Sequence, residues 1–177
     1  MINLRKVEEK DIPILLAWYN WYILNGTETF ETEPLTKEEF AERVHRITRE
    51  YPYIVLEEDG KLCGYAYLDH FNGRAAYDWT ADLSIYLNPE EKGKGYGSIL
   101  MKEILHLAEI NGYRNVISII TETNRTSLAF HEKFGFTKMA EFPSLGYKHG
   151  QWLGVSYYLK QLVKDEKEPE KLRNQYE

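Results

Sequence analysis

The sequence of 177 residues is poor in cysteine, has no long apolar run and carries no excess of positive charge. Its single cysteine, Cys63, cannot form an internal disulfide, which is typical of proteins in the reducing cytoplasm. No apolar run approaches the roughly 20 residues that a helix needs to cross a bilayer. Residues 1–11 are charged and lack the apolar core of a secretory signal. We therefore expect a cytoplasmic protein with no membrane partner.

Charge and histidine spacing argue against two further classes of protein. The net charge of −6 gives no electrostatic support for binding nucleic acid, whose phosphates attract basic surfaces. The five histidines show no metal-ligand spacing, so we expect no bound metal. The length and the hydrophobic content of 43% favour one folded domain, which we place at residues 1–163. The polar tail at 164–177 is expected to fray or to form a solvated helix.

The hydrophobic pattern predicts the element order βααβββαβαββ, an α/β sandwich with a mixed central sheet. Helix starts are indicated by Asp11 before Pro13 and by the capping box Thr36-Lys-Glu-Glu39. Asp59-Gly60 marks a hairpin turn. Strands are expected at 2–7, 53–57, 62–68, 77–87, 115–121, 137–142 and 153–159, further helices at 98–110 and 127–134, and a loop at 146–150.

The most informative segment is residues 88–98, Asn-Pro-Glu-Glu-Lys-Gly-Lys-Gly-Tyr-Gly-Ser, which lies between an apolar strand pattern and an amphipathic helix pattern. The alternate glycines Gly93, Gly95 and Gly97 let the backbone fold tightly and turn several N–H groups the same way. The N-terminus of the following helix adds unpaired donors and the positive end of its dipole. The segment therefore predicts a site for phosphate or pyrophosphate.

The spacing of the glycines narrows the class of ligand that this loop could bind. A P-loop would need Gly-Lys-Ser/Thr, and a dinucleotide fingerprint would need a third glycine where Ser98 stands. The remaining pattern, Lys92-Gly93-Lys94-Gly95-Tyr96-Gly97, resembles the Gln/Arg-x-x-Gly-x-Gly/Ala loop of the GNAT superfamily of N-acetyltransferases. In that family the loop wraps the pyrophosphate of acetyl-CoA, which the resemblance implies as the co-substrate. Lys92 departs from the usual Gln/Arg but keeps a positive charge.

A second segment supports the same family. Residues 123–136, Thr-Asn-Arg-Thr-Ser-Leu-Ala-Phe-His-Glu-Lys-Phe-Gly-Phe, are similar to the GNAT signature Asn-x-x-(Ala/Ser)-x-x-x-(Tyr/His)-x-x-x-Gly-Phe. Two motifs in the expected order are far more specific than one, and they imply a GNAT-type α/β sandwich with a mixed, mostly antiparallel sheet that is splayed at the coenzyme site. The resemblance implies coenzyme contacts from Lys92, Gly93, Lys94, Gly95, Tyr96, Gly97, Ser98, Asn124 and Ser127, and from the main chain of Ile85, Tyr86 and Leu87.

Within the family, the chain looks like the phosphinothricin N-acetyltransferase group. The segments that carry this closer resemblance are residues 29–34, 65–67, 74–80 and 146–152. Members of that group acetylate the primary amine of small amino acids such as phosphinothricin or methionine sulfoximine and are usually homodimers. The resemblance therefore implies a small-molecule amine as substrate and a second copy of the chain as partner.

Asp82 is the candidate base, because it is the one carboxylate inside the otherwise apolar strand pattern at 79–87. In the resembling group this position usually holds glutamate, so the shorter aspartate favours action through a bridging water. Buried carboxylates often have a raised pKa, which suits a base. The alternative is a structural carboxylate that hydrogen-bonds a neighbouring strand.

His131 is the candidate acid that protonates the departing thiolate. It occupies a place where many relatives carry tyrosine and where histidine is common in the phosphinothricin group. An imidazole that titrates near 6.5 can donate a proton to sulfur. The alternative for His131 is a structural role in its helix, and Asn124 and Ser127 have a parallel alternative as ordinary helix caps.

Arg74 is the candidate partner for a substrate carboxylate, since a guanidinium binds a carboxylate with two parallel hydrogen bonds. A solvated loop arginine is the alternative. Further side chains expected to shape the substrate pocket or a dimer contact are Phe30, Tyr77, Trp79, Lys148 and His149.

The leading hypothesis is an N-acetyltransferase that moves the acetyl group of acetyl-CoA directly to the amine of a small amino-acid-like molecule. The acceptor could instead be a polyamine, an aminoglycoside or a protein N-terminus. A hypothesis from another class is a regulatory module that binds coenzyme A and has lost catalysis, which Asp82 in place of glutamate encourages.

Overall fold

The computed structural model describes residues 1–91 and 93–176, and its elements follow the predicted order. The strands are β1 (Ile2–Lys6), β2 (Tyr53–Glu58), β3 (Lys61–His70), β4 (Thr80–Leu87), β5 (Asn115–Thr121), β6 (Thr137–Lys148) and β7 (Gln151–Gln161). The helices are α1 (Ile12–Asn25), α2 (Lys37–Glu50), α3 (Tyr96–Ile110) and α4 (Arg125–Lys133), with short 3₁₀ turns η1 (Glu9–Asp11) and η2 (Ala75–Tyr77).

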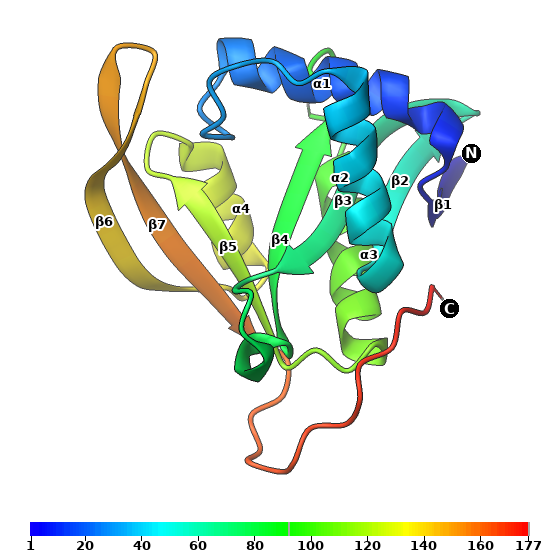
Figure 1. Cartoon of the computed structure of the whole chain (residues 1–177), viewed down its shortest axis with the longest axis vertical. Coiled ribbons are helices and arrows are strands. Elements are labelled where there is room, and N and C mark those ends of the chain that lie inside the picture. Colours follow the sequence, from blue (N-terminus) through cyan, green and yellow to red (C-terminus); the bar gives the residue numbers. More distant parts are fainter. Residues whose placement is uncertain (92, 177) are drawn as a thin grey trace.

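The strands form one sheet in the order β1-β2-β3-β4-β5-β7-β6. Every neighbouring pair is antiparallel except β4 and β5, which are parallel. The parallel pairing covers only Thr80–Asp82 against Asn115–Ile117, and beyond it the two strands diverge (Figure 1). The predicted fold class, a mixed and mostly antiparallel sheet that opens at its centre, is confirmed.

Helices cover both faces of the sheet and bury two apolar clusters. On one face α1 and α2 pack side chains such as Leu15 and Phe40 against Tyr65 of β3. On the other face α3 packs Leu100 and Met101 against alternate strand residues. Burying one such side chain fully contributes roughly 1.5–3 kcal/mol, so these clusters hold β3 and β4 rigidly beneath the helices.

The local helix signals are partly confirmed. Thr36 and Glu39 form the predicted capping box, in which Thr36 Oγ1 accepts from the Glu39 N–H at 3.2 Å and the Glu39 carboxylate accepts from the Thr36 N–H at 2.8 Å. Asp11 precedes α1 but does not cap it with its side chain. Its carboxylate instead accepts two hydrogen bonds from Arg5, at 2.7 and 2.9 Å, and this pairing offsets the cost of burying the charge.

Several element boundaries differ from the prediction, and three regions show why. β4 begins at Thr80 and not at residue 77, because residues 75–77 form the turn η2. α3 begins at Tyr96, two residues before the expected start, because the left-handed Gly95 already caps it. The expected loop at 146–150 is mostly strand, since His149 and Gly150 have φ of 52° and 76° and close a tight two-residue turn between β6 and β7.

The C-terminal tail is also ordered differently from the prediction. Its described part contains neither helix nor strand and lies along the molecule in an extended path (Figure 1). The indole N–H of Trp79 donates to the Glu170 carbonyl at 2.8 Å, and the Gln175 N–H donates to the Asn111 side chain at 2.6 Å. Leu172 and Tyr176 pack against the apolar cluster beside α3, so tertiary contacts replace the local structure that a polar sequence lacks.

Candidate functional site

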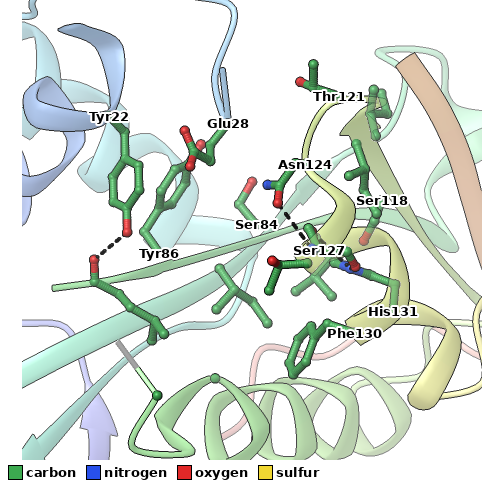
Figure 2. Close-up of a pocket in the computed structure, with 18 residues that line it drawn as sticks. Tyr22, Glu28, Ser84, Tyr86, Ser118, Thr121, Asn124, Ser127, Phe130 and His131 are labelled. Atoms are coloured by element: carbon green, nitrogen blue, oxygen red, sulfur yellow. Dashed lines mark hydrogen bonds between the residues drawn. The ribbon is translucent and has the colours of Figure 1, made fainter. Parts of the chain in front are cut away.

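A pocket of about 460 Å³ lies where β4 and β5 diverge. Its walls come from the C-terminal halves of both strands, the starts of α3 and α4, and the loop that follows α1 (Figure 2). Because β5 no longer pairs with β4 beyond Asp82, main-chain groups of both strands are exposed to the pocket instead of to each other. The site is therefore a gap in the sheet, and it continues to the glycine-rich loop.

The glycine-rich loop has the backbone that its spacing predicts. Gly93 and Gly95 have φ of 86° and 81°, and a Cβ built on either would meet nothing within 4 Å. Gly97, in the first turn of α3, lines the pocket together with Gly93. Left-handed backbone beside a helix N-terminus presents N–H groups toward open space, which suits a phosphate.

The neighbours of these glycines contribute in different ways. Lys94 lies at the surface with its ammonium 3.8 Å from Glu91, while Lys92 lies outside the described residues. The Tyr96 side chain is buried and its hydroxyl donates to Glu58 at 2.6 Å, so only its main chain is available to a ligand. Ser98 lies in the first turns of α3 and does not line the pocket.

Some main-chain N–H groups of β4 point toward β3, and the others point toward the pocket. The Asn88 N–H donates to the Cys63 carbonyl at 2.9 Å, which makes Gly64 and Leu87 a pair without hydrogen bonds between them. Since N–H groups alternate sides along a strand, those of Ile85 and Leu87 point toward the gap, whereas that of Tyr86 points to β3. Among the three residues predicted to offer main-chain donors, Ile85 and Leu87 fit that role, and Tyr86 lines the pocket with its ring.

The start of α4 forms the wall opposite β4. Asn124 Oδ1 accepts from the Ser127 N–H at 3.1 Å and caps the helix, and both residues line the pocket (Figure 2). The cap role and the pocket role that the sequence left open therefore coexist. One turn later, His131 also faces the pocket.

His131 is held in one tautomer by its own helix. Its side chain is 7% exposed, and Nδ1 lies 2.8 Å from the Ser127 carbonyl, which can only accept. Nδ1 therefore carries the hydrogen, and Nε2 keeps its lone pair. Burial lowers the pKa of His131 from its usual 6.5, so the ring is neutral at pH 7. In this state His131 accepts a proton and does not donate one from Nε2.

Asp82 lies at the last residue of the parallel pairing, one position below the open part of the gap. By strand alternation it shares a face with Ser84 and Tyr86, which line the pocket, but Asp82 itself is not part of the wall. Whether Asp82 acts through a bridging water therefore stays a prediction.

A second carboxylate lies directly across the strand pair from Asp82. Asp69 of β3 is its cross-strand partner, and Arg46 of α2 binds Asp69 through two hydrogen bonds of 2.6 and 2.9 Å. Burial raises the pKa of Asp82 to about 7, and the negative charge of Asp69 adds to the rise, while a hydrogen bond from the Leu83 main chain and the charge of His70 oppose it. Asp82 can therefore exchange a proton near neutral pH.

The predicted substrate residues of the β3–β4 connection do not line the pocket. Arg74 immediately precedes η2 and Tyr77 is its last residue, and both are exposed. This turn precedes β4, whereas the pocket lies at the other end of that strand. Trp79 binds the C-terminal tail. Within one chain, Arg74 therefore lies outside this pocket, and its role as a carboxylate partner stays a prediction.

The other predicted substrate residues support the loop after α1. The Lys148 ammonium is buried and donates to the Thr29 carbonyl at 2.7 Å. A ring nitrogen of His149 lies 3.1 Å from the Gly26 carbonyl, and the Phe30 ring packs closely over Gly146. These three side chains are outside the pocket wall, and they fix the loop that reaches it.

Several residues that line the pocket are not among those predicted from the sequence. Ser84 could have been found from its alternation with Asp82. Glu28 lies in a loop without periodicity, and Ser118 resembles any small residue of a buried strand. The Ser118 hydroxyl is buried and has no hydrogen-bond partner among the described residues, and Figure 2 shows it directed toward the side of the pocket where His131 lies.

Two kinds of feature are absent from the described residues. No helix among residues 1–91 and 93–176 is long and apolar enough to cross a membrane. Over the same residues, no three His, Cys, Asp or Glu side chains are grouped so that they could hold a metal ion.

The chain is similar to known acetyltransferases in sequence and in structure. The family model "Acetyltransferase (GNAT) domain" matches residues 4–154. A phosphinothricin N-acetyltransferase of Streptomyces viridochromogenes is 32% identical over 157 residues, which are 89% of this chain and 86% of the relative. An L-methionine sulfoximine/L-methionine sulfone acetyltransferase of Salmonella typhimurium is 27% identical over 162 residues, which are 91% of this chain and 95% of the relative.

A solved structure agrees with the sequence comparisons. The phosphinothricin acetyltransferase of Sinorhizobium meliloti, a GNAT superfamily member solved in complex with AcCoA, superposes with a TM-score of 0.91 at 33% identity. The match covers 96% of this chain and 93% of the other. With its divided sheet, glycine-rich loop and neutral histidine in one pocket, the chain belongs to the GNAT family of acetyltransferases, as a relative of the phosphinothricin N-acetyltransferases.

Proposed function

We propose that the protein transfers the acetyl group of acetyl-CoA to the primary amine of a small amino-acid-like substrate, directly and within a ternary complex. The observation that carries the proposal is the pocket between β4 and β5, which joins the glycine-rich loop to His131. The names of the relatives, which refer to phosphinothricin and methionine sulfoximine, support an acceptor of that kind.

The residues present fit a coenzyme A thioester. Its pyrophosphate suits the N–H groups around Gly93 and Gly95, where the space is open and the positive end of the α3 dipole adds attraction. The gap beside β4 offers unpaired main-chain groups to the amides of the pantetheine arm. When bound, the thioester supplies an activated acetyl group, and no covalent intermediate with the enzyme is required.

The amine must lose a proton before it can attack, because an alkyl ammonium has a pKa near 10. His131 lines the pocket and its Nε2 keeps a free lone pair, so we assign this nitrogen to accept that proton. Asp82 is a second acceptor, through a water, with its pKa near neutrality. The N–H groups of Ile85 and Leu87 are oriented to donate to the oxyanion of the tetrahedral intermediate.

The same imidazole can finish the reaction. After it takes a proton from the amine, His131 carries a hydrogen on Nε2 and can give it to the departing thiolate, which restores the neutral ring. One bond forms between nitrogen and the acetyl carbon, one carbon–sulfur bond breaks, and one proton leaves to solvent. His131 thus serves first as base and then as the acid that the sequence predicted.

Release of coenzyme A thiol tests the proposal, with phosphinothricin, methionine sulfoximine and a polyamine as acceptors. Gly95→Ala should raise the KM for acetyl-CoA about tenfold, because a side chain at φ of 81° costs roughly 1–2 kcal/mol and moves the loop. Gly60→Ala is the matched control, since Gly60 has φ of 78° in the β2–β3 turn, away from the pocket. Coenzyme binding without turnover on any amine would favour the regulatory module instead.

A homodimer is part of the proposal. Large apolar side chains are exposed on the outer strands β6 and β7, among them Met139 and Tyr147, which are 61% and 58% exposed, and Trp152, which is 65% exposed. Exposed apolar surface of this extent is typical of an interface. Light scattering after size exclusion should give twice the chain mass of 20.9 kDa, and a monomer mass at micromolar concentration would contradict it. A cytoplasmic location stays a prediction.

A further inference from the structure

One buried hydroxyl of the pocket wall makes no hydrogen bond within the described chain. Ser118 of β5 is 2% exposed, and its Oγ has no partner there. Among the buried side-chain oxygens of the described residues that lack a partner, that of Ser118 alone belongs to the pocket wall. Burying an unpaired hydroxyl costs folding free energy, because its hydrogen bonds to water are lost without replacement. Such a group in a pocket wall points to a ligand as its partner.

Ser118 lies at the narrow end of the gap between β4 and β5. The last parallel pair is Asp82 with Ile117, and Ser118 is the next residue of β5. From there the strands diverge toward the end of β4, which leads into the glycine-rich loop (Figure 1). Leu83, at the matching position of β4, is apolar and offers the hydroxyl no side-chain partner. A ligand that fills the gap from the loop inward therefore reaches Ser118 with its innermost end.

Ser118 shares a face of the sheet with α4, the helix that carries His131. Ile120, two residues further along β5, packs into the apolar cluster beside α3, and strand alternation places Ser118 on the same face. The cross-strand partner of Ser118 is Tyr158, whose hydroxyl donates to Glu132 at 2.9 Å, so α4 covers this part of the sheet. In Figure 2 the Ser118 hydroxyl is directed toward the side of the pocket where His131 lies. The hydroxyl and the imidazole therefore belong to the same corner of the pocket.

Other polar groups of this wall already have partners. Thr121 Oγ1 donates to a main-chain carbonyl of the loop after α1 at 2.6 Å. Asn124 Oδ1 accepts from the Ser127 N–H, and the Ser127 carbonyl lies 2.8 Å from His131 Nδ1. The Ser118 hydroxyl has no such partner within the described chain, and because a hydroxyl can rotate, it can aim its hydrogen at a ligand.

We propose that Ser118 is a further catalytic residue, whose hydroxyl donates a hydrogen bond to the departing sulfur of the thioester. This rests on the proposed function, in which the pyrophosphate lies at the glycine-rich loop and the pantetheine arm directs the thioester toward the narrow end of the gap. As the carbon–sulfur bond breaks with its electron pair on sulfur, His131 gives the sulfur the proton from Nε2. Ser118 keeps its own hydrogen, so the balance of the reaction is unchanged. Its hydrogen bond strengthens as charge develops on sulfur, which lowers the barrier.

Two matched variants of the full chain separate a catalytic hydroxyl from one that is only buried. Ser118→Ala removes the hydroxyl from the pocket. Ser156→Ala is the control, because Ser156 of β7 is fully buried, lacks a partner among the described residues and lies outside the pocket wall. It pairs with Ile120 and so lies on the same face of the sheet. Both variants should melt at or above the wild-type temperature, since each loses an unpaired buried hydroxyl. A lower melting temperature for Ser118→Ala would show that its hydroxyl has a structural partner and would contradict the proposal.

Turnover gives the first readout. With saturating acetyl-CoA, Ser118→Ala should lower kcat/KM for methionine sulfoximine about tenfold, measured as release of thiol. The KM for acetyl-CoA should stay within about twofold, because the hydrogen bond is strong only when sulfur carries charge. Ser156→Ala should keep the wild-type values. An unchanged kcat/KM in Ser118→Ala would overturn the proposal.

Calorimetry tests the contact without turnover, by comparing coenzyme A with desulfo-coenzyme A, which lacks the sulfur. At pH 9 an alkyl thiol such as that of cysteine, with a pKa of about 8.5, is largely ionised and can accept the hydrogen bond from Ser118. The ratio of the Kd for desulfo-coenzyme A to that for coenzyme A should fall about fivefold in Ser118→Ala and keep the wild-type value in Ser156→Ala.

The two readouts distinguish failure of the contact from failure of the proposed function. If the Kd ratio falls in Ser118→Ala but wild type acetylates no amine, the proposed function fails and the contact of Ser118 with sulfur stands. If wild type acetylates amines and Ser118→Ala changes neither the Kd ratio nor kcat/KM, the contact fails and the proposed function stands.

Discussion

Replacing His131 by alanine should lower kcat about a hundredfold and leave the KM for acetyl-CoA within about twofold. The reason is the fixed tautomer: the Ser127 carbonyl holds the hydrogen on Nδ1, so Nε2 is the free acceptor that the ammonium needs. The imidazole also returns the proton to the thiolate, so its loss affects both halves of the reaction. Steady-state release of thiol measures kcat.

Two further variants make this result specific. His106→Ala is the matched control, because His106 is exposed on α3 and lies outside the pocket wall. His131→Gln fills much of the same volume and can still donate to the Ser127 carbonyl, but it cannot take up a proton. If the glutamine variant kept wild-type kcat, the role of His131 would be structural.

Much of the fold follows from local signals. The capping box at Thr36 and the Asp59-Gly60 turn each act through a few adjacent residues, and each forms as predicted. Strand ends were less predictable, because pairing with a neighbour decides where a strand stops. β6 extends to Lys148 since β7 pairs with it as far as the turn, although the sequence of that segment is typical of a loop.

The candidate site, like the fold, could be predicted from the sequence only where its residues are adjacent in the chain. The glycine-rich loop and the start of α4 are each contiguous in sequence, so their motifs could be recognised from the residues alone. Glu28 and Ser118 enter the pocket from a loop and a strand about 90 residues apart, and no local pattern marks them. Asp69 affects Asp82 because β3 and β4 pair in one register, which only the folded sheet defines.

Asp82→Asn should lower kcat/KM about a hundredfold at pH 8 and remove the acid limb of its pH profile. In wild type that limb should lie near the Asp82 pKa of about 7, because Asp82 accepts a proton only when ionised. Asp69→Asn should move the limb to lower pH, since it removes the negative charge that helps to raise the pKa of Asp82. The profile is measured with saturating acetyl-CoA from pH 5 to 9.

The two candidate bases give different profiles. The acid limb near pH 7 should persist in His131→Ala at reduced rate, because burial keeps the pKa of His131 below that of free imidazole. It should disappear in Asp82→Asn. If the limb were instead lost in His131→Ala and kept in Asp82→Asn, the histidine would be the titrating base and Asp82 a structural carboxylate.

The raised pKa also makes Asp82 a cost to stability, which a structural carboxylate with good partners would not be. Between the unfolded pKa near 3.9 and the folded pKa of about 7, the folded state holds a proton that the unfolded state has lost, so raising the pH lowers the free energy of unfolding. Asp82→Asn should therefore raise the melting temperature, and by more at pH 8 than at pH 5. Asp78→Asn, at an exposed position, should change neither value. A lower melting temperature for Asp82→Asn at pH 8 would mean that the ionised carboxylate stabilises the sheet. If Asp82 is instead retained for proton transfer, the variant should be more stable and less active than wild type.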